Sequence, residues 1–325
     1  MTTADYLVVM DFDGTVADTF KPGPGGLGVT EAYQNAVSEL FGAQGPEVFD
    51  RVGGLQNRTP GELIQHMLSE GPFDNLVDSA RAFHERHVHR LGNCVPAGKG
   101  LSLEWDDNAP AGAITELLVR LKLSYLMEQV GAQMDNGSCW PQQCSGLASF
   151  LDAISWLNRH HDVDILVAII SSGHEQFIRR TFCSWGLPVP PIMLSDDDLR
   201  GMGEIESHRR VKPSPFLMTL VHKQWARIRG LRLDQAVTED MRSHTVMCGD
   251  DWRKDGGLAQ NCGVPFLWFN PTGAKANDLP EPSVGFRCWT QPAGLLASPE
   301  TEELLSQGGA FSDIVRQWQR QVVRV

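Results

Sequence analysis

The stretch VVMDFDGTVADT, residues Val8–Thr19, carries an apolar run that leads directly into two aspartates. The run does not alternate between apolar and polar residues, which is typical of a parallel strand buried on both faces. Asp11 and Asp13 are two positions apart, so their side chains face the same side if the strand reaches them. The glycine and threonine that follow indicate a turn. We therefore predict a buried strand over Tyr6–Phe12 that carries two neighbouring carboxylates at its carboxyl end.

Four later apolar runs have the same character, and helical patterns lie between most of the runs. A helix is predicted just before the second strand, over LASFLDAISWLNRH, and another just after it, over EQFIRRTFCSWG, which ends at Gly186. Strands that alternate with helices indicate a doubly wound, Rossmann-like α/β domain with a parallel sheet. The four further strands are predicted at Asp164–Ile170, Pro191–Leu194, Thr245–Cys248 and Pro265–Phe269.

A long interval between the first two strands contains helical patterns and no convincing strand. We expect an α/β core at residues 1–20 and 140–325, with a mostly helical domain inserted at 21–139. Two more helices are expected near the C-terminus, and the second should pack against the core through an apolar stripe. The inserted helices are predicted at Thr30–Phe41, Thr59–Glu70, Asn75–Leu91 and Ile114–Val130, and the terminal ones at Pro299–Ser306 and Phe311–Val322.

Composition restricts the class of protein. The 325 residues are 42% hydrophobic and 21% charged, a globular balance, and the formal net charge of −12 argues against a general nucleic-acid binder. No apolar run is long enough to span a bilayer, and Asp5, Asp11 and Asp13 lie where a signal peptide would be apolar. We expect a soluble cytoplasmic protein with neither nucleic acid nor membrane as partner. The sequence leaves open whether it is a monomer or a homodimer.

Polar groups also follow three of the later strands. The strand that ends in LVAII is followed by Ser171, Ser172 and a glycine, then by a helix, an arrangement that suits a phosphate group. Lys212 is followed by Pro213, in a segment that two prolines stiffen.

The fourth strand leads into GDDWRKD, which carries three acidic residues. Asp250, Asp251 and Asp255 would meet the first aspartate pair at one edge of the sheet, because the carboxyl ends of parallel strands lie together. Such a cluster of carboxylate oxygens is what a Mg²⁺ site requires.

Taken in order, these stretches resemble the four signatures of the haloacid dehalogenase (HAD) superfamily. The matching segments are DFDGT at Asp11–Thr15, Ser171 after AII, Lys212-Pro213, and GDDWRKD at Gly249–Asp255. The resemblance covers residues 6–19 and 141–270. It implies a Rossmann-like core, and the inserted helical domain has the position of this family's C1 cap.

The resemblance also implies a role for each matching residue. Asp11 would be the nucleophile that forms an aspartyl phosphate, and Asp13 the general acid and base. Ser171, with Ser172 in the same loop, would bind the phosphoryl oxygens, and Lys212 would neutralise charge between nucleophile and phosphate.

The metal and supporting roles follow in the same way. Asp250 would bind Mg²⁺ together with the Asp11 carboxylate and the Asp13 carbonyl oxygen. Asp255 resembles the last acid of the fourth signature, which orients Lys212 or a metal-bound water. Asp251 could share one of these duties, and the spacing does not decide between the two.

The inserted domain contains RVGGLQNRTPGELI, which resembles the cap stretch that faces the site in several family members. Arg58 in this stretch is a candidate contact for the substrate, although a surface charge is the more common reason for an arginine there.

The predicted function is Mg²⁺-dependent hydrolysis of a small phosphorylated metabolite through an aspartyl phosphate. The family's dehalogenases lack the second aspartate, and Asp13 is present here. Two alternatives stay open: a phosphomutase of the same fold, and a non-catalytic binding or regulatory protein that kept the fold.

Overall fold

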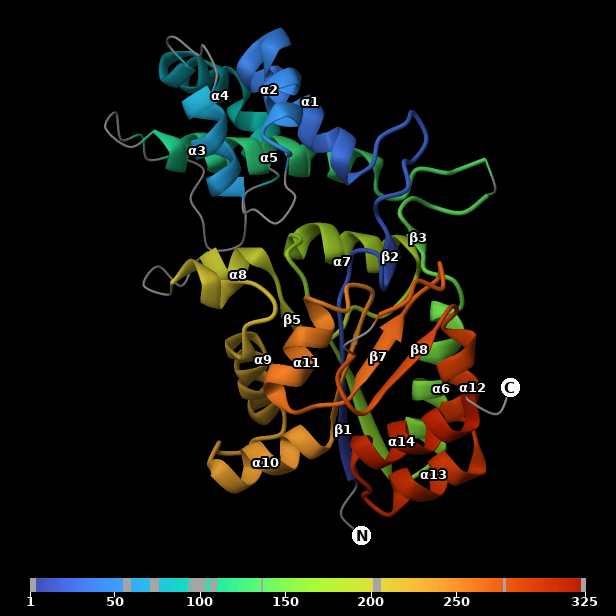
Figure 1. Cartoon of the computed structure of the whole chain (residues 1–325). Helices are drawn as coiled ribbons and strands as arrows, with labels where there is room; N and C mark the ends of the chain where they lie inside the picture. Colours follow the sequence, from blue (N-terminus) through green and yellow to red (C-terminus); the bar gives the residue numbers. More distant parts are fainter. Residues whose placement is uncertain are drawn as a thin grey trace. The chain divides into compact units, whose positions relative to one another are not determined.

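The computed structural model describes residues 4–54, 60–70, 76–92, 94, 103, 105, 110–135, 137–200, 206–276 and 279–322 (Figure 1). The chain divides into two compact units. The first, here called the α/β unit, comprises Met1–Asp18, Gln142–Glu175 and Pro188–Val325, and the second, the helical unit, comprises Thr19–Pro141 and Gln176–Leu187. Within the described part of the chain, no helix has the length and apolar character needed to cross a bilayer.

A six-stranded parallel sheet forms the centre of the α/β unit, with the strand order β5-β4-β1-β6-β7-β8. The first strand lies between β4 and β6, and Leu7–Met10 are almost fully buried, which explains their unbroken apolar run. The strands are β1 (Ala4–Met10), β4 (Val163–Ile170), β5 (Ile192–Leu194), β6 (Thr245–Gly249), β7 (Phe266–Phe269) and β8 (Ser283–Phe286).

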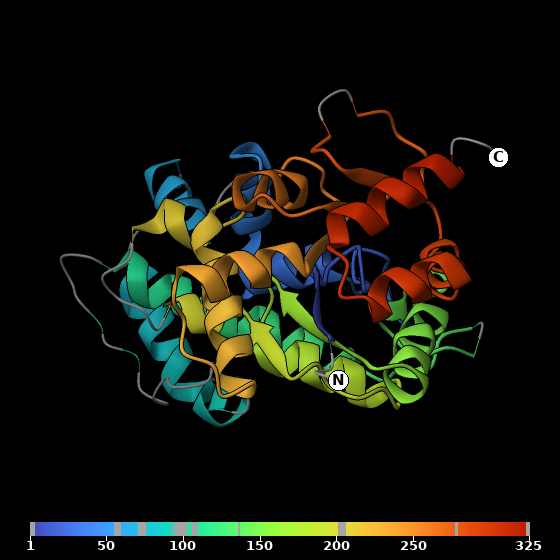
Figure 2. The same ribbon diagram turned by 90° about the horizontal axis from the view of Figure 1, so that it is seen from below.

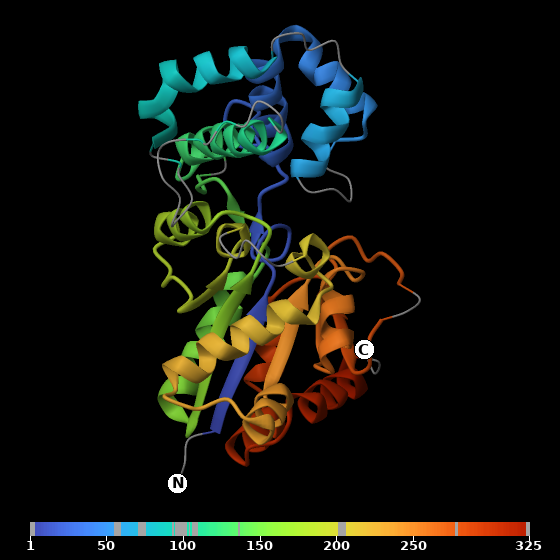
Figure 3. The same cartoon turned by 90° about the vertical axis from the view of Figure 1, so that its left-hand side faces the viewer.

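Helices cover both faces of the sheet, as Figures 2 and 3 show. Alternate residues of β1 face opposite sides: Leu7 and Val9 join the apolar cluster of one face, whereas Tyr6 contacts Phe311 and donates a hydrogen bond to the Leu305 carbonyl on the other. The first face is covered by α9 (Pro215–Ile228), α10 (Gln235–Ser243) and α11 (Asp255–Cys262), and the second by α6 (Leu147–His160), α12 (Thr290–Leu296), α13 (Pro299–Ser306) and α14 (Phe311–Val322).

The doubly wound α/β fold is therefore confirmed, with strand ends that differ from the predicted ones by at most two residues. One difference matters for the site: β1 ends at Met10, so Asp11 and Asp13 lie in the turn after the strand and not on it. The edge strand β8 was not predicted, because it is short and Gly285 interrupts its apolar pattern.

The two predicted C-terminal helices are present with the expected bounds. In α14 the residues Phe311, Ile314, Val315 and Trp318 are buried, and the helix contacts β6 and β8. The expectation that this apolar stripe packs on the core is confirmed.

The helical unit is built around a helix that is buried along most of its length, α5 (Ala111–Gln129). Apolar side chains from the surrounding helices form one core with it. The sequence did not predict α2, which begins with Gly45 and Pro46, two residues that break a helical pattern. The other elements of this unit are α1 (Val29–Phe41), η1 (Gly42–Gln44), α2 (Gly45–Arg51), α3 (Pro60–Glu70), α4 (Leu76–Gly92) and α7 (Glu175–Ser184).

A small antiparallel pair lies where the chain leaves and re-enters the α/β unit. Strand β2 (Ala17–Asp18) pairs with β3 (Gln142–Gln143). The Cys144 amide extends this contact by donating to the Val16 carbonyl at 2.9 Å. The turn that follows Asp13 is thereby tied to the segment that resumes the α/β unit.

Candidate active site

The turn after β1 places two acidic side chains at the carboxyl edge of the sheet. The Asp11 amide donates to the Cys248 carbonyl at 2.9 Å and so continues the pairing with β6. Gly14 has a φ of 80°, and a Cβ atom there would lie 2.6 Å from an Asp250 carboxylate oxygen. Glycine at this position therefore adopts the left-handed backbone conformation without strain and also leaves room for the Asp250 carboxylate, which follows the neighbouring strand.

Asp250 follows β6 and faces this turn. Its Oδ1 accepts a hydrogen bond of 2.9 Å from the Thr15 hydroxyl, which joins the first and fourth signature loops directly. One carboxylate oxygen from each of Asp11, Asp250 and Asp255 lies within 4.8 Å of the other two. The structure thus brings together three of the acidic residues that the sequence analysis singled out, and they are named the acidic cluster below.

Lys212 lies at the centre of this cluster. Its Nζ donates to Asp11 Oδ1 and, at 2.7 Å, to Asp255 Oδ1. Burial alone lowers the pKa of Lys212, but the charges of Asp11 and Asp255 outweigh it and raise the pKa above its ordinary value. The lysine is therefore charged, and it bridges the first, third and fourth signatures.

Asp255 begins α11 and is almost fully buried. Its second oxygen accepts from the Asp251 amide at 3.2 Å. A Cβ atom on Gly249 would lie 2.2 Å from Asp255 Oδ2, so a side chain at position 249 would collide with this carboxylate. The glycine of the fourth signature is thus required by the close approach of Asp255.

Asp251 has a different environment. Its Oδ1 accepts from the Arg253 and Lys254 amides at 2.9 and 3.1 Å, and its side chain is 40% exposed. These contacts fix the turn between β6 and α11. Asp255, and not Asp251, is the acid that contacts Lys212.

The loop after β4 brings a hydroxyl to the second aspartate of the turn. Ser171 Oγ lies 3.3 Å from Asp13 Oδ2, to which it donates, and accepts from the Gly173 amide at 2.8 Å. The Ser171 amide donates to the Leu194 carbonyl at 3.0 Å, which ties the loop to the end of β5. Ser172 is exposed. The Asp13 carboxylate therefore contacts the predicted phosphate loop, while the Asp11 carboxylate contacts Lys212.

A buried hydrogen-bonded pair of side chains that the sequence analysis missed supports the same loop. His174 Nδ1 lies 2.8 Å from Asp197 Oδ1, and both side chains are at most 2% exposed. The other oxygen of Asp197 accepts from the Glu175 amide at 3.0 Å, at the start of α7. Asp197 belongs to α8 (Asp196–Arg200), so the loop is held from the element that follows β5. The only hint of this pair in the sequence was the acidic run Asp196–Asp198, and nothing in the spacing connected this run to a histidine 23 residues before Asp197.

The acidic cluster carries more negative than positive charge. In the described part of the chain, Lys212 supplies the ammonium group for three carboxylates. Burial, and then the charge of Asp11, raise the pKa of Asp250 to about 6. Burial also raises the pKa of Asp255. A raised pKa favours the neutral form of this acid, whereas it favours the charged form of its partner Lys212. Because the lysine contacts two carboxylates, it stays charged. The excess negative charge then favours the protonated form of the acids.

This excess is the observation that fits a divalent cation. The donors are carboxylate oxygens, which Mg²⁺ prefers, and they converge within the reach of one ion. Asp11 and Asp250 are the side chains that would hold it, and the second oxygen of Asp250 lies close to Gly14.

Arg58, the candidate substrate contact, lies outside the described residues.

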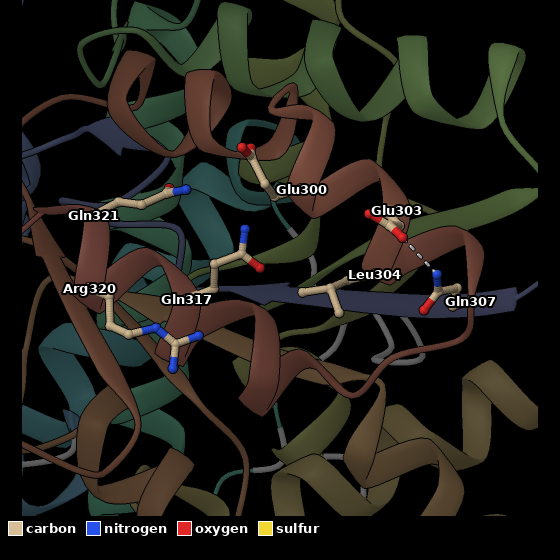
Figure 4. A pocket seen from close by; sticks show the side chains of 7 residues that line it. All are labelled: Glu300, Glu303, Leu304, Gln307, Gln317, Arg320 and Gln321. Carbon is tan, nitrogen blue, oxygen red and sulfur yellow. Dashed lines mark hydrogen bonds between the residues drawn. The ribbon is translucent and has the colours of Figure 1, made fainter.

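A separate recess lies between α13 and α14, with a cavity volume of about 460 Å³ (Figure 4). The close-up shows mostly amide and charged side chains around it, with a hydrogen bond between Gln307 and Glu303. None of the predicted site residues lines it. The lining residues are Glu300, Glu303, Leu304, Gln307, Gln317, Arg320 and Gln321.

Comparison with known proteins gives matches among solved structures. They include YfnB from Bacillus subtilis, described as a HAD hydrolase bound to magnesium (15% identity, 90% of this chain and 100% of that chain, TM-score 0.42). Another match is CbbY from Rhodobacter sphaeroides in complex with phosphate (13% identity, 92% of this chain and 99% of that chain, TM-score 0.45). A 2-haloacid dehalogenase from Pseudomonas syringae pv. Tomato DC3000 is also similar (18%, 90% and 98%, TM-score 0.43).

No protein-family model matches the chain, and neither does any curated protein. At such low identities and TM-scores these matches assign neither a family nor an activity to the chain.

Proposed function

We propose that the protein is a Mg²⁺-dependent phosphatase that hydrolyses a small phosphorylated metabolite through an aspartyl phosphate on Asp11. One observation carries the proposal: Lys212 bridges the carboxylates of Asp11 and Asp255 beside Asp250, while the carboxylate of Asp13 contacts the Ser171 hydroxyl. Two carboxylates of one turn are therefore held in different surroundings, which suits two different roles in one reaction.

In the first step, an Asp11 carboxylate oxygen attacks phosphorus, and the bond from phosphorus to the leaving oxygen breaks. Asp13 gives its proton to that oxygen, and the alcohol leaves. The Lys212 ammonium, already in contact with Asp11, balances the negative charge that nucleophile and phosphoryl group bring together. Ser171 is placed to donate its hydroxyl hydrogen to a phosphoryl oxygen in place of Asp13.

In the second step, Asp13 takes a proton from water as the water oxygen attacks phosphorus. The bond between phosphorus and the Asp11 oxygen breaks, which restores the carboxylate and releases inorganic phosphate. Mg²⁺, held by Asp11, Asp250 and the Asp13 carbonyl oxygen, would supply charge neutralisation for the phosphoryl oxygens.

We further propose that the helical unit acts as a cap that recognises the rest of the substrate, with Arg58 as one contact. The larger segment of this unit, Thr19–Pro141, lies in the sequence between the first and second signatures, which supports this role. A cap of this kind excludes water from the site and provides specificity.

A phosphomutase would use the same residues and would differ in passing the phosphoryl group to a second substrate. A dehalogenase, the activity named for one similar structure, is disfavoured by Asp13, because a proton donor for the leaving oxygen has no counterpart role in replacing a halide. A non-catalytic protein would have no need to keep Lys212 between two buried carboxylates, an arrangement that is costly to desolvate.

The proposal is tested by a screen of phosphorylated metabolites and an aryl phosphate, with release of inorganic phosphate as readout. We expect hydrolysis with Mg²⁺ and loss of hydrolysis with a chelator. Asp11→Asn, purified in the same way, controls for contaminating phosphatases. Full activity of wild type in metal-free buffer, or equal activity in the Asp11→Asn preparation, would contradict the proposal.

A further inference from the structure

Two buried tryptophans contact the loops that carry the acidic cluster, and no sequence motif predicted a role for either. Trp289 Nε1 donates to the Thr15 carbonyl at 2.9 Å. Trp268 Nε1 donates to the Asp250 carbonyl, also at 2.9 Å. Thr15 and Asp250 are themselves joined by the hydrogen bond between their side chains. Both ends of that hydrogen bond are thus anchored by an indole.

Each indole is held rigidly by its surroundings. Trp289 is fully buried, its ring lies 4.7 Å from those of Phe150 and Phe286, and it stacks on Phe269. Its own amide donates to the Ser145 carbonyl at 2.8 Å. The ring therefore has one orientation, and its N–H group points at one carbonyl.

Trp268 is fixed by the sheet. It lies on β7, opposite Gly249 of β6, and it is 6% exposed. On the other side, Trp268 is paired in register with Gly285 of β8. The strand that carries Trp268 thus braces the residue that follows the neighbouring strand, Asp250.

A phenylalanine would supply apolar packing of a similar kind at both positions, but it has no donor. A buried indole N–H needs a partner, and here both partners are carbonyls of the loops that carry the site. These two peptide groups set the direction of the Asp250 side chain toward Asp11. Outer contacts of this kind orient the groups that bind a metal or substrate.

We propose that Trp268 and Trp289 are positioning residues, which fix the backbones of Asp250 and Thr15 and so hold the Asp250 carboxylate in place for a divalent cation. The inference rests on the proposed function, since it concerns the same acidic cluster. It adds two residues outside all four signatures to the machinery of the site.

The chain offers a matched control. Trp318 is also buried, and its Nε1 donates at 2.9 Å to the Thr301 hydroxyl, between α14 and α13. Trp318→Phe removes an indole hydrogen bond of the same length from the same unit, with no contact to the signature loops. Its effect on stability estimates the structural cost of losing such a bond.

The experiment compares Trp268→Phe and Trp289→Phe with Trp318→Phe. Mg²⁺ affinity is measured by isothermal titration calorimetry, kcat and KM with an aryl phosphate, and stability by thermal unfolding. We expect similar losses of stability in all three variants. Mg²⁺ affinity and kcat should fall about tenfold or more in the first two, and less than about twofold in the control. Equal effects in all three variants would overturn the inference.

A double-mutant cycle tests the route through Thr15. Thr15→Val removes the hydroxyl that contacts Asp250, and Trp289→Phe removes the anchor of the same residue. If the indole acts through Thr15, the double variant loses little more Mg²⁺ affinity than Thr15→Val alone, whereas additive losses contradict the route. Should Trp289→Phe fail to fold, Trp268→Phe against the Trp318→Phe control decides the proposal.

The outcomes separate the inference from the proposed function. A wild-type protein that binds Mg²⁺ and hydrolyses phosphate esters, with variants no worse than the control, leaves the function standing and rejects the positioning role. A wild-type protein that does neither rejects both.

Discussion

The two flanks of helix α9 each carry a cation that bridges two carboxylates, at opposite ends of strand β1. Before the helix, Lys212 contacts Asp11 and Asp255 at the carboxyl edge of the sheet. After it, Arg229 contacts Asp5 at 3.2 Å and Asp164 at 2.8 Å at the amino edge.

The surroundings of the two bridges differ. The side chains of the Lys212 bridge are 2–12% exposed, whereas Asp5 and Asp164 are more than one-third exposed. At the amino edge Asp5 and Asp164 are register partners on adjacent strands, so Arg229 relieves a repulsion that the sheet itself creates. At the carboxyl edge a further carboxylate, Asp250, is present.

The two bridges differ in the way that distinguishes an ion pair that stabilises the fold from a functional site. An exposed bridge is solvated and contributes little, and its charges are balanced by water and salt. A buried bridge with surplus acid opposes folding, because desolvation of the charges costs more than their attraction returns. Such a cluster is expected where chemistry requires it.

The largest expected effect comes from exchanging the two cations for methionine. Lys212→Met should lower kcat on an aryl phosphate by roughly 10²–10³-fold, since it removes the charge beside the nucleophile. Arg229→Met should leave kcat within about twofold, because the change lies at the other edge of the sheet. Both are assayed at a temperature where circular dichroism shows folded protein. A similar loss of kcat in both variants would show that the two edges of the sheet do not differ in function.

A change at Asp250 should alter the stability of the metal-free protein. Burial, and then the charge of Asp11, raise its pKa from the ordinary value of 3.8 to about 6, so the folded state holds this proton more tightly than the unfolded state. Wild type should therefore lose stability relative to Asp250→Asn as pH rises from about 4 to 6, by roughly 3 kcal/mol.

Denaturant unfolding of both proteins across this pH range measures the difference. Below pH 4 the two should converge, and Mg²⁺ at pH 7 should stabilise wild type alone. Asp164→Asn, at the amino edge, should show no such gain in stability over wild type as pH rises. A metal-free Asp250→Asn protein that is less stable than wild type at pH 7 would contradict the account of surplus charge.

The smallest expected effect concerns the stability supplied by the amino-edge bridge. Arg229→Met should reduce the free energy of unfolding by about 1 kcal/mol at low salt, and less at high salt, because the side chains involved are partly solvated. Arg316→Met is the control, since Arg316 and Asp313 form an exposed pair within one helix. A loss no greater than that of the control would show that Arg229 does not offset the repulsion between Asp5 and Asp164.

The sequence predicted those parts of the fold that depend on local pattern. The unbroken apolar runs of β1, β4 and β6 lie in the buried interior of the sheet, where such runs are required. The edge strand β8 has few residues and a central glycine, so its pattern is too weak to recognise. Helix α2 was missed because its first residues, Gly45 and Pro46, resemble a loop.

The candidate site, too, could be predicted only as far as local pattern determines it. Order and spacing placed acidic residues, a serine and a lysine at one sheet edge, because strand ends converge there. Spacing could not choose between Asp251 and Asp255, since the choice depends on which side chain the turn directs inward. The pairing of His174 with Asp197, and the two tryptophan anchors, depend on contacts between distant segments that no local pattern records.

The central claim is that Asp11 attacks phosphorus while Asp13 moves the proton. It is tested most directly by incubating Asp11→Asn and Asp13→Asn with a labelled phosphate ester that has a very good leaving group, and measuring label bound to denatured protein. Asp13→Asn keeps the nucleophile but has no base to activate water, so labelled protein should accumulate. Asp11→Asn should carry no label. Label on the Asp11→Asn protein, or near-normal turnover by it, would contradict the mechanism.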